Sequence, residues 1–202
     1  MTDNTRTKGF TLIELLLAMA FIAFLLLFMV AAILQVTKLY VKGSAIRQIN
    51  QTGRQLMDTV GSTLRNNADP SNPSGANRLC AGNTTYVWNS EGEAINKFSG
   101  SDAATELRFI SIQDPGGALC NSTSTPVNKA KTVDLVGADI TPLEFSVKQQ
   151  GRLWTLSLVL STAGTNIATP DATTPTGFTC AADNQFCALG DFKTSVYSRG
   201  GE

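Results

Sequence analysis

The apolar positions of this chain are most concentrated near its N-terminus. Residues Phe10–Leu34 form an apolar run of 25 residues in which Glu14 is the only charge, and the run contains neither glycine nor proline. As an α-helix this run would measure about 38 Å, which is enough to cross a bilayer with a hydrocarbon core of roughly 30 Å. The pattern therefore predicts a membrane-spanning helix.

The helical pattern continues through residues 35–66, where it changes to a single apolar stripe. Apolar residues recur there at intervals of three, four and seven, with charged and amide residues between them, which is typical of an amphipathic helix. Gly43 and Gly53 each cost about 1 kcal/mol relative to alanine, so they soften the helix without having to break it. The prolines, glycine and short polar residues of 66–75 predict its end.

Residues 67–202 carry short runs of β-branched and aromatic residues between turn signals, which indicates antiparallel strands. The clearest pair is the alternating run 143–148 and the more continuously apolar run 153–160, with a tight turn at 149–151 between them. We expect 153–160 to be a central strand that the helix covers on one face. Further strands are predicted at 84–88, 106–112, 133–140 and 192–198, and an exposed loop at 161–177.

These patterns together predict the α+β fold class, with one long N-terminal helix packed on an antiparallel β-sheet head. We divide the chain at sequence level into a leader, an apolar half-helix, an amphipathic half-helix and a globular head. Their ranges are 1–9, 10–34, 35–66 and 67–202.

The formal net charge is zero, but the charges are distributed unevenly. Residues 10–66 hold five Lys or Arg against two acidic residues, whereas 67–202 hold nine against thirteen, a net charge of −4. An acidic head is a poor surface for non-specific DNA binding, because attraction to phosphates supplies most of that affinity. We therefore predict no direct nucleic-acid binding.

All four cysteines lie in the head, and their even number suits disulfides in an oxidising compartment. Four reduced thiols or a zinc site are the alternatives, but the chain has no CxxC pair and no histidine. Three connectivities are possible. We favour the pairs Cys80–Cys120 and Cys180–Cys187, the second closing a short loop that presents Asp183 and Asn184.

The sequence gives no sign of an enzyme. The absence of histidine removes Ser-His-Asp and Cys-His catalysis and the commonest zinc ligand. No phosphate-binding Walker motif is present, and the spacing of Cys180 and Cys187 disfavours a thiol oxidoreductase. We expect neither a cofactor nor a metal.

Two ordinary interpretations of the apolar run account for it less well. A secretory signal peptide has an apolar stretch of about 7–15 residues followed by a small-residue cleavage site, and this run is longer. A plain signal anchor fits the length but gives no reason for Glu14. A carboxylate at the centre of a membrane helix costs roughly 2.5–3.5 kcal/mol, and such a charge usually has a partner.

The start of the run resembles the type IV prepilin signal. A short leader with Arg6 and Lys8 precedes Gly9-Phe10-Thr11-Leu12-Ile13-Glu14, which matches that motif without a gap. The resemblance implies that a prepilin peptidase cuts after Gly9 and methylates the new N-terminal Phe10. It also implies that Glu14 pairs with the α-amino group of Phe10 on a neighbouring subunit and so sets the assembly register.

The pilin resemblance implies a structural subunit of a type IV pilus or related filament, and the 140–160 hairpin is similar to W-type minor pilins and J-type pseudopilins. Ala31 stands where many major pilins have a proline, which favours a minor pilin or pseudopilin. The implied partners are other pilin subunits, the peptidase and an inner-membrane assembly platform. The N-terminus would be cytoplasmic and the head outside, on the cell surface after assembly. A membrane-anchored adhesin that never polymerises and a pseudopilin of type II secretion are the alternatives.

Overall fold

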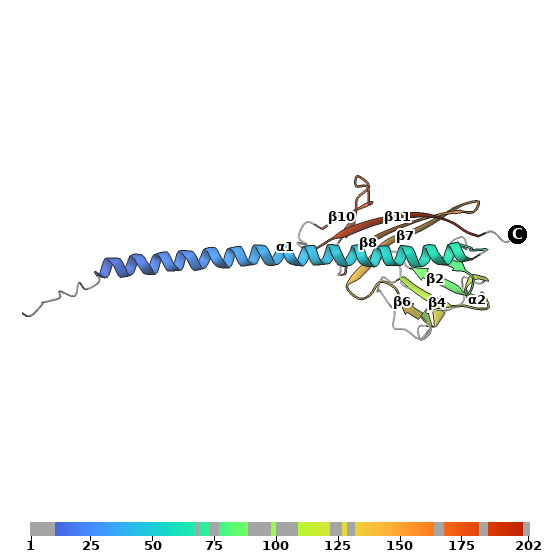
Figure 1. Cartoon of the computed structure of the whole chain (residues 1–202), viewed down its shortest axis with the longest axis horizontal. Coiled ribbons are helices and arrows are strands. Elements are labelled where there is room, and N and C mark those ends of the chain that lie inside the picture. Colours follow the sequence, from blue (N-terminus) through green and yellow to red (C-terminus); the bar gives the residue numbers. More distant parts are fainter. Residues whose placement is uncertain are drawn as a thin grey trace, which may run out of the picture. The chain divides into compact units, whose positions relative to one another are not determined.

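A computed structural model describes residues 11–67, 69–72, 77–88, 98–99, 109–121, 127–128, 132–163, 168–181 and 186–199. The chain divides into two units, Met1–Val41 and Lys42–Glu202. Helix α1 (Leu12–Asn66) begins in the first unit and ends in the second (Figure 1). The predicted helix is confirmed, and it ends at Asn66, within the predicted stop.

The part of α1 in the second unit buries one stripe of its surface. The buried residues recur every three or four positions, as one face of a helix requires. They are Ile49, Gly53, Leu56, Met57, Val60, Gly61 and Leu64. The amphipathic half predicted from the sequence therefore packs one face into the protein core.

Three long antiparallel strands form one sheet in the order β11-β8-β7 (Figure 1). They are β7 (Ile140–Gln150), β8 (Leu153–Thr162) and β11 (Leu189–Tyr197). The predicted hairpin and the central position of its second arm are confirmed. Gln150 pairs with Leu153, so the turn residues are Gly151 and Arg152, one position later than predicted. Gly151 has φ +60°, which a residue without a side chain adopts at little cost.

The core lies between α1 and this sheet. Alternate residues of β8 point to one face, and four of them are fully buried in the same cluster as the buried helix residues. They are Trp154, Leu156, Leu158 and Leu160. The sequence-based expectation that the helix covers one face of the central strand is confirmed.

A second antiparallel sheet has the order β1-β2-β4-β6. Its strands are β1 (Arg78–Ala81), β2 (Thr84–Trp88), β4 (Phe109–Gln113) and β6 (Thr132–Asp134). One face joins the main core, and the other packs Val87, Ile110 and Ile112 against Leu119 of the short helix α2 (Ala118–Asn121).

Aromatic side chains connect the two sheets. The ring of Phe145 on β7 meets those of Trp88 and Phe109 edge-on, each with ring centroids 4.7 Å apart. Edge-to-face geometry at this separation is favourable beyond the area that it buries. The two sheets therefore share one continuous core.

Two smaller strand pairs complete the described elements. Strands β9 (Ala168–Pro170) and β10 (Phe178–Cys180) pair antiparallel, and β3 (Phe98–Ser99) and β5 (Val127–Asn128) pair parallel. Ala168 and Phe178 pack with Leu143 and Val159 in a small cluster of their own.

The structure corrects two predictions. The predicted strand 133–140 is broken, because β6 ends at Asp134 and β7 begins at Ile140, with a turn between them in which Gly137 has φ +77°. The predicted exposed loop 161–177 instead contributes the end of β8 and all of β9, and Ala168 is buried.

Candidate functional site: the apolar segment of α1

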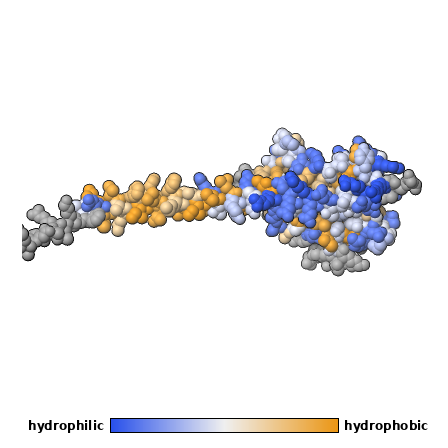
Figure 2. All heavy atoms as spheres, in the orientation of Figure 1, coloured by the Kyte–Doolittle hydropathy of each residue, from blue (hydrophilic) through white to orange (hydrophobic). Residues whose placement is uncertain are grey.

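The apolar segment, defined here as residues 11–34, is exposed along its whole length. Its large side chains remain accessible, with exposed fractions from 41% for Leu25 to 77% for Leu12. Figure 2 shows the same segment as a nearly continuous apolar surface. Burying a single Leu, Ile or Phe is worth about 1.5–3 kcal/mol, so the exposed side chains together are worth tens of kcal/mol in apolar surroundings. Such a surface needs a lipid or protein environment.

This helix is long and apolar enough to cross a membrane by length and composition. The structure is therefore compatible with the predicted single membrane span.

The first turn of the segment is closed by reciprocal hydrogen bonds between Thr11 and Glu14. The backbone N–H of Thr11 donates to Glu14 Oε2 at 3.0 Å, and the backbone N–H of Glu14 donates to Thr11 Oγ1 at 3.4 Å. The Thr11 hydroxyl also donates to Oε2 at 2.9 Å. This is a capping box, in which residues three apart satisfy two backbone donors that the helix itself cannot.

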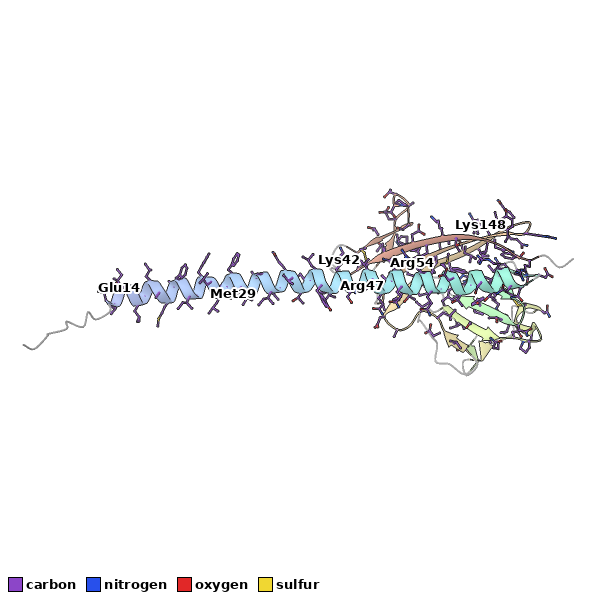
Figure 3. The ribbon with its side chains drawn as sticks, viewed as in Figure 1. Glu14, Met29, Lys42, Arg47, Arg54 and Lys148 are labelled. Carbon is purple, nitrogen blue, oxygen red and sulfur yellow. A yellow bond between two sulfur atoms is a disulfide. The ribbon has the colours of Figure 1, made fainter. Side chains whose placement is uncertain are left out.

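The capping box orients the only charge of the segment. Both bonds from Thr11 end on Oε2, and among the described residues no hydrogen bond reaches Glu14 Oε1. Glu14 is exposed at the start of the helix, where a carboxylate also interacts favourably with the helix dipole (Figure 3). One carboxylate oxygen is therefore held in place while the other stays open to a cation.

Sequence reasoning predicted Glu14 but missed its partner Thr11. The signal was present, since Thr followed three residues later by Glu before an apolar run is the pattern of a capping box. Gly9 and Phe10, the predicted cleavage and methylation residues, lie outside the described residues.

The four cysteines pair as the sequence analysis favours. Cys80 at the centre of β1 bonds to Cys120 in α2, with Cα atoms 6.2 Å apart, and Cys180 at the end of β10 bonds to Cys187, at 5.8 Å. The predicted loop residues Asp183 and Asn184 lie outside the described residues.

A buried polar network lies beside the first disulfide. Asp114 accepts hydrogen bonds from the backbone N–H groups of Ala118 and Leu119, and Arg78 donates to the carbonyl oxygen of Leu119. Burial lowers the pKa of the Arg78 guanidinium, and the Asp114 charge opposes this shift. These contacts fix α2 against β1, so the Cys80–Cys120 region serves the structure of the head.

The described part of the chain holds no group of three or more His, Cys, Asp or Glu side chains placed to bind a metal ion. Comparisons with protein-family models, with curated proteins and with solved structures found no match.

Proposed function

We propose that this chain is a structural subunit of a type IV pilus or a related filament, stored in a membrane through its apolar segment and then assembled through the same segment. The observation that carries the proposal is an apolar helical segment that is exposed along its whole length and has a single, capped carboxylate at its start. A bilayer and a bundle of identical helices would both cover that surface.

The position of Glu14 supports assembly in particular. Near the membrane interface its charge is tolerable, whereas in a bundle of apolar helices an unpaired carboxylate costs several kcal/mol. The methylated α-amino group of Phe10 on a neighbouring subunit is a suitable cation, and Glu14 Oε1 accepts no hydrogen bond from the residues that the structure describes. Pairing would fix the axial register of an incoming subunit, because apolar helices alone slide past one another with little penalty.

The proposed orientation has the N-terminus in the cytoplasm and the head outside. Arg6 and Lys8 in the leader favour a cytoplasmic N-terminus, but Lys38 and Lys42 lie just beyond the other end of the span, so the positive-inside rule alone does not decide the orientation. Two disulfides in the head suit an oxidising compartment. The partners are then a prepilin peptidase, an inner-membrane assembly platform and other subunits.

Processing is the first test. Intact-mass measurement of the protein from its native membrane should show loss of residues 1–9 and one added methyl group on Phe10. Gly9→Val should give an uncut precursor that still inserts, because the peptidase must seat the backbone closely at this residue. A native chain that retains Met1 would contradict the proposal.

Assembly is the second test, and it uses Glu14→Ala with Glu14→Asp as the variant that keeps the charge. Both should be processed and inserted, and the amount in sheared filaments relative to membranes should fall strongly for alanine and less for aspartate. Equal incorporation of both variants would remove Glu14 as the register signal. Absence of the wild-type protein from sheared filaments would favour a membrane-anchored adhesin.

A further inference from the structure

Polar and charged residues follow the apolar segment, beginning with Gln35. The Thr37 hydroxyl donates to the backbone carbonyl of Ile33 at 2.9 Å, so this group is satisfied within the helix and tolerates apolar surroundings. Lys38 is the first charged residue after Glu14. Lys38 is therefore the first residue after the apolar segment whose charge keeps its side chain out of the hydrocarbon core.

The spacing of the two charges matches a bilayer. Glu14 and Lys38 are 24 residues apart in one helix, a rise of about 36 Å. The Lys38 side chain leans toward the N-terminus of the helix as the Glu14 carboxylate does, so the two charged groups keep about this separation. A helix tilt of roughly 30° fits the span to a hydrocarbon core of about 30 Å.

Tyr40 provides an amphipathic ring at the same level. Its side chain is 76% exposed, and the neighbouring Leu39 is 73% exposed. Tyrosine is enriched where a membrane helix enters the headgroup layer, because the ring packs among acyl chains while the hydroxyl remains hydrated.

The charge of this stretch suits anionic lipids. The sequence has no acidic residue between Glu14 and Asp58, and Lys42 and Arg47 follow Lys38. Each Lys or Arg near an anionic membrane surface is attracted measurably, and the attraction is screened by salt. We propose that Lys38 and Tyr40 form a headgroup anchor for anionic phospholipids at the end of the span. This inference rests on the membrane-spanning part of the proposed function and not on filament assembly.

The test measures depth in vesicles. Because the four native cysteines are paired, Gln35→Cys introduces the only free thiol for a spin label. The full-length protein is reconstituted in phosphatidylcholine vesicles with and without phosphatidylglycerol. Accessibility to oxygen and to a polar nickel complex then reports how deeply position 35 lies.

With phosphatidylglycerol present, Lys38→Gln combined with Tyr40→Ala should let position 35 sink by up to one turn, about 5 Å. Lys38→Arg with Tyr40→Trp should keep the original depth. Lys148→Gln, an exposed lysine on β7, is the matched control and should change nothing (Figure 3). The original protein should lose its dependence on phosphatidylglycerol at high salt.

An unchanged depth in the Lys38→Gln, Tyr40→Ala protein would overturn the anchor. A spin label at Ala23→Cys separates this outcome from failure of the span itself. If position 23 is buried in the bilayer while position 35 does not respond, the span stands and the anchor is wrong. If position 23 is not buried, the membrane-spanning part of the proposed function fails as well.

Discussion

At the scale of single residues, a hydrogen bond between side chains joins α1 to the second sheet. It links Thr63 Oγ1 and Tyr86 Oη at 2.8 Å, and Tyr86 is only 2% exposed. Burial raises the pKa of the Tyr86 phenol, although the hydrogen bond with Thr63 opposes the shift. The folded head therefore holds the phenolic proton more tightly than the unfolded chain does.

The first prediction concerns the alkaline limit of stability. The contribution of Tyr86 is fully present below its unfolded pKa of about 10 and is lost as the pH rises through its higher folded pKa. We expect the free energy of unfolding, measured by urea denaturation, to fall as the pH increases above about 10. Tyr86→Phe should cost about 1 kcal/mol at neutral pH and make that fall shallower. An identical pH dependence in both proteins would contradict this role of Tyr86.

At the scale of elements, α1 meets β11 at a glycine. A Cβ atom added at Gly53 would lie 2.3 Å from the ring of Phe192, so this ring occupies the space that any larger residue would need. The absence of a side chain is therefore what lets the helix and the strand approach. Apart from the neighbouring backbone of its own helix, no described atom lies within 4 Å of a Cβ added at Gly43.

The second prediction compares these two glycines. Gly53→Ala should lower the free energy of unfolding by about 1–3 kcal/mol, because the Phe192 ring must shift within the contact. Gly43→Ala should raise helix stability by up to about 1 kcal/mol, through helix propensity alone. Thermal denaturation should show a lower Tm for Gly53→Ala and an unchanged or higher Tm for Gly43→Ala. A higher Tm for Gly53→Ala would show that the Phe192 ring moves without penalty.

The third prediction concerns the two disulfides, which also act between elements. The paired cysteines are 40 residues apart in Cys80–Cys120 and 7 apart in Cys180–Cys187. Chain entropy then gives about 4 kcal/mol for the first and about 2.4 kcal/mol for the second. Replacing each pair by alanine should lower the free energy of unfolding, measured by urea denaturation, in this order. A larger loss for the Cys180–Cys187 pair would mean that chain entropy does not decide the contribution of the two disulfides.

At the scale of the whole molecule, every buried residue of the main core belongs to the second unit, from Ile49 to Val196. The fourth prediction is that a chain beginning at Lys42 folds alone into a monomeric head. Size-exclusion chromatography should give one monomeric species, and circular dichroism should show cooperative unfolding. Aggregation with a non-cooperative transition would mean that the head depends on the first unit.

The sequence predicted those elements whose signals are local. The helix stop before Pro70 and the alternation of 143–148 depend only on neighbouring residues, and both led to correct elements. Strand β1 was missed because an arginine is typical of the surface, whereas Arg78 is buried and interacts with Asp114 and Leu119, about 40 positions away. Strand β9 was missed because its Thr and Pro residues are typical of loops.

The features of the candidate site were likewise predictable where their signal is local and not where it depends on distant contacts. Glu14 stands out by local composition, whereas the choice among three cysteine connectivities depends on α2 lying beside β1, which no local pattern specifies. The Thr11 cap was within reach of local reasoning, because its spacing from Glu14 is itself the signal.

The burial of both tryptophans in the head has a spectroscopic consequence. Trp154 is fully buried and Trp88 is 6% exposed, whereas the apolar segment contains no tryptophan. Intrinsic indole fluorescence of the native chain therefore reports only the integrity of the head. A blue-shifted emission maximum that stays constant on transfer from detergent to lipid would show that the head is intact. With Phe24→Trp, any change in emission on the same transfer would then report the surroundings of the apolar segment.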